Sequence, residues 1–208
     1  MDLIQGLQYD TVYHEHLRYY SLHSLSHLLK MHGLELFHTA RIPTHGGSFR
    51  AYASRPGRYR IRESVERMLR EERPVVLETG NLHRFRDRVV HSKLELLALL
   101  SRIRKGGASL FGISAPSRAS TLIHYTGIDD GILDCVVEVE GSHKIGKYVP
   151  GTRIPVHEES KLFREQPDYA LVLSWHIADE LMPKLRGRGF RGGFIVPLPS
   201  PKVIHDHD

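Results

Sequence analysis

Short apolar segments alternate with helical segments through the second half of this chain, and this alternation constrains its fold more than any other feature. The segment 133–139 is apolar and β-branched, as expected of a strand buried on both faces. Strands that alternate with helices form right-handed βαβ crossovers, which predicts an α/β fold with a doubly wound, mainly parallel sheet. Further strands are predicted at 109–113, 154–156, 168–173 and 194–197, and helices at 117–126 and 178–185.

The first part of the chain begins with a helix followed by a pair of strands. Ser21 is a suitable N-cap, a stripe of leucines follows it, and Gly33 ends the helix predicted for residues 21–32. Strands are predicted at 34–41 and 48–53. The turn between them contains two glycines, which adopt positive φ without strain.

A second region is predicted after the turn Arg55-Pro56-Gly57, which is typical of a boundary. Helices are predicted at about 61–72 and 82–105, ahead of the strands of the parallel sheet. We therefore expect three segments: residues 1–54, residues 55–200 and a tail, 201–208, whose last four residues we expect to be disordered.

The composition excludes some classes of protein and some kinds of ligand. The single cysteine, Cys135, excludes an internal disulfide and a cysteine-rich zinc site, and the absence of a long apolar run or a signal peptide favours the cytoplasm. The net charge of +5 suits an anionic ligand such as a nucleotide diphosphate. Because the arginines are scattered and no aromatic-interleaved RNA motif or zinc-finger spacing is present, we expect neither a nucleic-acid partner nor a membrane.

Histidines are frequent, yet we expect no metal. His23 and His27 are four residues apart on the helix at 21–32, a spacing that can hold a metal. No third ligand is placed by the sequence, and the neighbouring leucines indicate an ordinary amphipathic helix.

The tetrapeptide Tyr13-His14-Glu15-His16 combines two imidazoles, a carboxylate and a phenol just before the helix cap at Ser21. Loops on a scaffold often carry catalytic groups, and histidine is the base whose pKa lies nearest neutrality. A neighbouring carboxylate can orient and tune such a base. On composition alone, a polar loop without a catalytic role is the favoured interpretation.

Three further segments combine glycines with polar residues. Thr44-His45-Gly46-Gly47 joins two predicted strands, and Gly112-Ile113-Ser114-Ala115-Pro116-Ser117-Arg118 lies between a strand and a helix, where backbone N–H groups can face an anion. In Gly146-Lys147-Tyr148-Val149-Pro150-Gly151-Thr152, Lys147 and Tyr148 lie between glycines in a predicted loop. Each of them is also compatible with an ordinary turn or solvated loop.

Taken together and in this order, these segments resemble the C-terminal part of the SAM-dependent nucleotide-sugar C-methyltransferases. The resemblance implies that residues 1–54 are the last segment of a class I methyltransferase fold and that residues 55–200 form a Rossmann-like C-terminal domain. It covers nearly all of residues 9–199. The family's cysteine-rich zinc module and its glycine-rich SAM loop have no counterpart before residue 9.

The resemblance also implies roles for individual residues. His16 is the expected base, with Glu15 and Tyr13 as its partners, and His45 is an expected substrate contact. The remaining expected substrate contacts are Ser117, Arg118, Lys147 and Tyr148. The family usually has lysine, glycine and asparagine at Arg118, Ala119 and Ser120, and asparagine at His176, so these departures bear on which substrate is bound.

The implied function is the sugar-handling half of a C-methyltransferase that acts on a keto-deoxysugar linked to a nucleotide. Its cofactor is S-adenosylmethionine (SAM), for which we expect an incomplete site within these residues. Either a partner chain supplies the SAM site or the chain is a truncated version of such an enzyme. We also expect the chain to associate with a partner chain or with itself as a homo-oligomer. The alternatives are a non-catalytic module that binds a nucleotide sugar and an interaction protein that keeps only the fold.

Overall fold

The computed structural model describes residues 1–205, and contacts divide the chain into two compact units. Unit 1 comprises residues 1–8 and 14–88, and unit 2 comprises residues 9–13 and the chain from Val89 onward. These units differ from the segments expected from the sequence, since residues 55–88 group with the first segment. Residues 206–208, at the end of the expected tail, lie outside the described residues.

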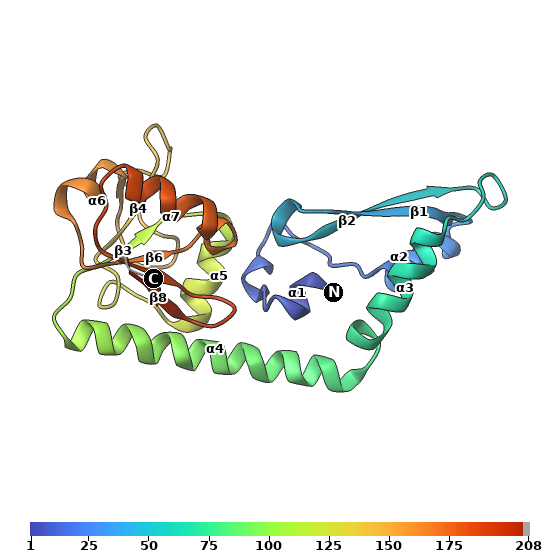
Figure 1. The fold of residues 1–208 in the computed structure, drawn as a ribbon, viewed down its shortest axis with the longest axis horizontal. Helices are drawn as coiled ribbons and strands as arrows, with labels where there is room; N and C mark the ends of the chain where they lie inside the picture. Colours follow the sequence, from blue (N-terminus) through green and yellow to red (C-terminus); the bar gives the residue numbers. More distant parts are fainter. Residues whose placement is uncertain (206–208) are drawn as a thin grey trace. The chain divides into compact units, whose positions relative to one another are not determined.

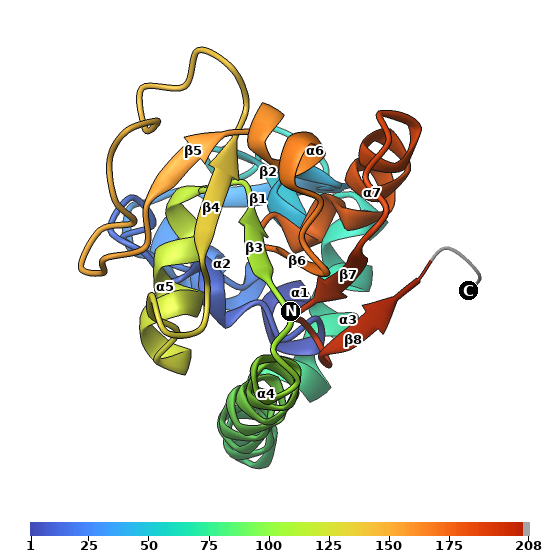
Figure 2. The same ribbon diagram turned by 90° about the vertical axis from the view of Figure 1, so that its left-hand side faces the viewer.

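Unit 2 is built on a sheet of order β5-β4-β3-β6-β7-β8. Every neighbouring pair from β5 to β7 is parallel, whereas β8 pairs antiparallel with β7. This confirms the predicted α/β fold with a mainly parallel sheet (Figure 2). The strands are β3 (Leu110–Ile113), β4 (Cys135–Glu138), β5 (Val156–Glu158), β6 (Tyr169–Val172), β7 (Gly193–Val196) and β8 (Lys202–Ile204).

Helices cover both faces of this sheet, as a doubly wound fold requires. The helices α6 (Ser160–Glu165) and α7 (Ala178–Gly187) pack on one face, where Leu162 and Leu185 join a core with alternate residues of the strands. The other face carries α5 (Ser117–Thr126), whose Leu122 and Ile123 are fully buried (Figure 2). Burial of large apolar side chains of this kind stabilises a fold by about 1.5–3 kcal/mol each.

The strand order creates a topological switch point between β3 and β6. From β3 the chain moves outward through α5 to β4 and β5, and α6 then returns it to β6 on the opposite side of β3. In open α/β sheets, ligands bind in the crevice outside the carboxyl ends of the strands at such a point. The segments that follow β3 and β6 are therefore the first place to look for a site.

Unit 1 is a β-hairpin packed against two helices (Figure 1). The hairpin is formed by β1 (Glu35–Ile42) and β2 (Ser48–Ser54), which pair antiparallel. Its core joins Leu22 of α2 (Leu22–Met31) with Leu36 of β1 and with Val65 and Met68 of α3 (Glu63–Val76). The packing of α3 on the hairpin explains why unit 1 extends beyond the Arg55-Pro56-Gly57 turn.

The remaining elements are either too short to predict or differ in their bounds from those predicted from the sequence. A helical turn, α1 (Asp2–Gln5), and the strand β8 carried no recognisable pattern, and β8 lies inside the expected tail. The helix α4 (Thr79–Lys105) starts before the expected residue 82 and contributes residues to both units. Among residues 1–205, no helix combines the length and the apolar composition that crossing a bilayer would require.

The helix α2 begins against a buried carboxylate. Glu72 of α3 is 2 % exposed; it accepts a hydrogen bond of 2.8 Å from the backbone N–H of Leu22 and lies 3.1 Å from Nδ1 of His23. Ser21 and Ser24 form a capping box at the same end of the helix. A carboxylate at a helix N-terminus satisfies unpaired N–H groups and interacts favourably with the helix dipole.

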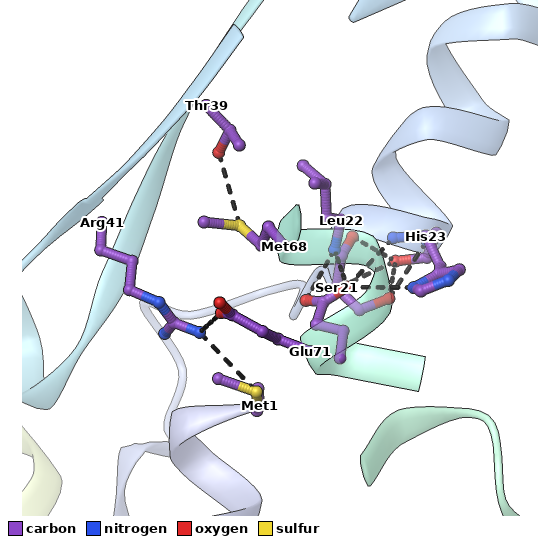
Figure 3. A network of polar contacts seen from close by, with 10 residues as sticks. Met1, Ser21, Leu22, His23, Thr39, Arg41, Met68 and Glu71 are labelled. Carbon is purple, nitrogen blue, oxygen red and sulfur yellow. Dashed lines mark hydrogen bonds and ion pairs between the residues drawn. The ribbon is translucent and has the colours of Figure 1, made fainter. Parts of the chain in front are cut away.

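Replacing Glu72 by alanine is expected to lower the free energy of unfolding by about 2 kcal/mol, because it leaves buried N–H groups at the start of α2 without an acceptor. The neighbouring Glu71→Ala is the matched control. Glu71 forms an exposed ion pair with Arg41, which contributes at most about 1 kcal/mol (Figure 3). Urea unfolding followed by circular dichroism would measure the free energy of unfolding of both variants. Equal decreases in the two variants would show that Glu72 does not cap α2.

Candidate functional site

The tetrapeptide at residues 13–16 lies in an irregular segment between a 3₁₀ turn, η1 (Tyr9–Thr11), and the N-cap of α2. His14 and Glu15 are exposed, and their side chains approach to 3.9 Å. Tyr13 and His16 are half-buried. Of the two histidines, His16 is therefore the one held partly out of water, as a positioned base would be.

His16 lies next to His45 within unit 1. The two imidazole rings are 6.0 Å apart between centroids and nearly perpendicular, and Tyr19 lies 6.1 Å from His16 in a similar edge-on arrangement. Two segments that the sequence singled out separately are thus neighbours in the fold. Their rings form a small cluster of imidazole and phenol groups, which are side-chain types that can take part in acid–base chemistry and hydrogen bonding.

His45 is held in an unusual backbone conformation. It lies in η2 (Thr44–Gly46), the turn between β1 and β2, with φ 56° and ψ 28° in the left-handed region. Residues other than glycine adopt this region at a cost of about 1–3 kcal/mol, and such strain is concentrated at functional sites. The strained turn places the ring of His45 beside that of His16, and a role for this turn beyond joining strands stays a prediction.

The two glycines of this turn are required for a close approach of the chain's first residues. A Cβ on Gly46 would lie 2.5 Å from Oε1 of Gln8, and one on Gly47 would lie 2.6 Å from a carboxylate oxygen of Asp2. Gln8 donates a hydrogen bond of 2.6 Å to the carbonyl of Gly46. Contacts with Asp2 and Gln8 therefore fix the turn that carries His45.

In unit 2, Ser117 and Arg118 form the first turn of α5, directly after the turn that follows β3. Ser114 in that turn has φ 66°, and Pro116 is the N-cap of the helix. Ser117 is half-buried, and the free N–H groups at this helix start can face an anion. The predicted order of strand, turn and helix is found here, and the structure places these residues at the switch point.

Arg118 is buried and is engaged with the chain itself. Its guanidinium donates two hydrogen bonds of 2.7 Å to the carboxylate of Asp10, which is 0 % exposed. The indole N–H of Trp175 donates a third to the same carboxylate, also at 2.7 Å. Direct contact between Arg118 and a substrate therefore stays a prediction.

Lys147 and Tyr148 lie in the loop between β4 and β5, and both are exposed. The loop folds back on itself, since the N–H of Val156 bonds to the carbonyl of Lys147 at 2.8 Å and Tyr148 forms an isolated bridge with Pro155. Both side chains are therefore available to a ligand on this loop.

Three functional candidates escaped the sequence analysis: Asp10, Glu138 and Lys144. Lys144 donates a hydrogen bond of 2.6 Å to the carbonyl of Ala115, and its Nζ lies 3.7 Å from Glu138. Glu138 also accepts the N–H of Ala115, so these two residues connect the β4–β5 loop to the turn before α5. Its position at the carboxyl end of a buried strand could have signalled Glu138, whereas nothing around Asp10 distinguished it.

The expected residues fall into two groups. Glu15, His16 and His45 belong to unit 1, whereas Tyr13, Ser117, Arg118, Lys147 and Tyr148 belong to unit 2. Within residues 1–205 there is no group of three or more histidine, cysteine, aspartate or glutamate side chains placed to hold a metal ion.

Comparisons with known proteins identify the family of this chain. The family model described as the C-methyltransferase C-terminal domain matches residues 43–199. The C-methyltransferase NovU of Streptomyces niveus is 32 % identical over 207 residues, which is 98 % of this chain and 49 % of NovU, so the chain spans about half the length of this relative. The parallel sheet, its switch-point turn and the polar loop after β4 all lie within the matched region, and the chain belongs to the C-methyltransferase C-terminal domain family.

Proposed function

We propose that this chain is the nucleotide-sugar-binding and proton-abstracting part of a SAM-dependent C-methyltransferase that acts on a keto-deoxysugar. The observation that carries the proposal is the proximity of His16 and His45, whose rings are 6.0 Å apart. Membership of the C-methyltransferase family supplies the reaction class, and these two residues supply groups that such a reaction needs.

His16 is the proposed base. A ketone makes the proton on the adjacent carbon acidic, and an imidazole that accepts this proton leaves an enolate whose carbon is nucleophilic. The abstracted proton then resides on His16, and the carboxylate of Glu15, the preceding residue, is proposed to balance its charge. His45 is proposed to donate a hydrogen bond to the developing enolate oxygen, which would stabilise the transition state electrostatically.

Unit 2 is proposed to hold the nucleotide diphosphate. The start of α5 with Ser117 offers backbone N–H groups, and Lys147 and Tyr148 offer an exposed cation and a ring on the β4–β5 loop. The chain's net charge of +5 favours an anionic ligand of this kind.

We propose that the turn after β3 does not bind SAM. Gly112 lies within β3 and is required for packing, because a Cβ there would lie 2.8 Å from Val136 and 3.1 Å from Leu173. The turn itself, residues 114–116, contains no glycine of the kind that lets a dinucleotide-binding loop bring its backbone close to a cofactor. We propose that the methyl donor is bound by another part of the protein, by a partner chain or in a homo-oligomer.

The alternative is a module that binds a nucleotide sugar without catalysing its methylation, or an interaction protein. The observation that favours these alternatives is that Arg118, at a position where the family usually has lysine, is bonded to Asp10 of the same chain. Binding measurements separate these possibilities.

Isothermal titration of the chain with dTDP-linked sugars and with SAM is the test. We expect micromolar binding of a dTDP-sugar and no micromolar binding of SAM. Lys147→Ala should weaken sugar binding about tenfold through loss of one charge-assisted contact. The control, Lys105→Ala at the exposed end of α4, should leave it unchanged. Absence of dTDP-sugar binding would overturn the proposal, and micromolar SAM binding would overturn the placement of the donor site.

A further inference from the structure

Asp10 and Arg118 form the most completely buried ion pair among the described residues. Both carboxylate oxygens are used: Oδ1 accepts from one guanidinium N–H₂ group, and Oδ2 accepts from Arg118 Nε and from the indole N–H of Trp175, each at 2.7 Å. Asp10 is 0 % and Arg118 6 % exposed, and the guanidinium lies 5.2 Å from the centroid of the Trp175 ring. Two parallel charge-assisted bonds give such a pair a fixed geometry.

The same short segment is attached to α5 at two further points. Thr121 donates a hydrogen bond of 2.8 Å to the carbonyl of Val12, and the ring of Tyr9 packs edge-on against Tyr125, 5.2 Å away. Burial raises the pKa of Tyr9 to about 12, so its phenol stays neutral in the packed segment. Residues 9–13 therefore belong to unit 2, although the residues on either side of them belong to unit 1.

The attachment lies at the switch point of the sheet. Arg118 is in the first turn of α5, which follows β3, and Trp175 begins η3 (Trp175–Ile177), which follows β6. The side chain of Asp10 thus joins the two segments between which an α/β sheet takes its ligand. The segment that it fixes ends at Tyr13 and leads directly into His14, Glu15 and His16.

We infer that Asp10 and Arg118 are positioning residues: their ion pair holds residues 9–13 at the switch point and so fixes the start of the loop that carries the proposed base. This inference rests on the proposed function, and it assigns Arg118 an indirect role in place of a contact with the sugar. A lysine could not replace Arg118 in this role, since its single ammonium cannot form the two parallel bonds.

The direct test is hydrogen–deuterium exchange of the full chain, which requires neither substrate nor SAM. Arg118→Lys and Asp10→Asn should raise the exchange rate of residues 9–16 at least tenfold while leaving the β3–β7 strands protected. Trp175→Phe removes one hydrogen bond and keeps a ring in place, so a smaller increase is expected. Arg102→Lys on the exposed part of α4 is the matched control and should change nothing.

Titration with the dTDP-sugar then separates a positioning role from substrate contact. For Arg118→Lys we expect a dissociation constant within about threefold of the parent, and in the assembled enzyme a kcat reduced about 10–100-fold with KM little changed. Weaker sugar binding with unchanged exchange would overturn the inference and make Arg118 a substrate contact. Unchanged exchange in both Arg118→Lys and Asp10→Asn would also overturn it.

The two proposals fail in different ways. If no dTDP-sugar binds to the parent chain but the exchange rates rise in the variants as expected, the proposed function fails and the attachment of residues 9–13 stands. Asp10→Asn or Arg118→Lys could lose protection from exchange throughout the sheet. In that case Trp175→Phe provides the decisive measurement. An unchanged exchange rate of residues 9–16 in Trp175→Phe would then overturn the inference.

Discussion

His16→Ala is expected to slow methyl transfer by about 10²–10⁴-fold in the assembled enzyme, because a general base in the transition state contributes about this factor. His16 is half-buried and faces His45 and Tyr19, so its ring is positioned by its neighbours. Single-turnover transfer, with SAM and the complementing part of the protein present, would measure the chemical step apart from product release.

Variants of the two neighbouring residues serve as controls for this prediction. His14 is exposed and only 3.9 Å from the Glu15 carboxylate, so His14→Ala should reduce the rate far less than His16→Ala. Glu15→Gln should have an intermediate effect if the carboxylate balances the charge of the protonated base. If His14→Ala slowed the reaction as much as His16→Ala, the assignment of the base to His16 would be wrong. Unchanged rates in all three variants would show that this loop has no catalytic role.

Gly192→Ala is expected to lower the free energy of unfolding by about 3 kcal/mol, the upper range of overpacking effects. A Cβ at this position would collide with the carbonyl oxygen of Pro167 and would lie 2.7 Å from Phe190 and 2.8 Å from the carbonyl oxygen of Asp168. The backbone oxygens cannot move aside, because Asp168 O accepts the N–H of Gly193 where β6 and β7 begin to pair.

Gly187→Ala is the matched control, since nothing lies within 4 Å of a Cβ at the end of α7. Alanine there should be neutral or stabilising by up to about 1 kcal/mol, because it restricts the unfolded chain. Chemical unfolding monitored by circular dichroism would measure both variants. A loss below 1 kcal/mol for Gly192→Ala would show that the start of β7 can shift to accommodate a side chain.

Much of unit 2 could be predicted because its signals are local. The segment 133–139 is apolar and β-branched, and β4 is found at Cys135–Glu138 within it. The helix predicted at 117–126 is found with these bounds, and the alternation of elements gave the mainly parallel sheet. The strand β8 could not be predicted, since three residues at an antiparallel edge are too few to show a periodic pattern.

The candidate site was predictable only in part. The turn that carries His45 and the loop that carries His16 were each recognisable from residue types, but their proximity depends on the hairpin and on contacts with Asp2 and Gln8. Arg118 was expected to contact a substrate because the family resemblance implied this role. Its carboxylate partner lies 108 positions earlier in the chain, where no pattern distinguished it.

The sequence by itself determined the type and order of most elements and the class of fold, because periodicity, caps and turn residues act over a few neighbouring positions. Only the tertiary structure decided that α3 packs with the hairpin, that His45 meets His16, and that Asp10 is buried against Arg118. Each of these depends on side chains that are distant in the chain and become neighbours only when apolar faces are buried together. Pairwise contacts of this kind leave no mark in the local sequence on either side.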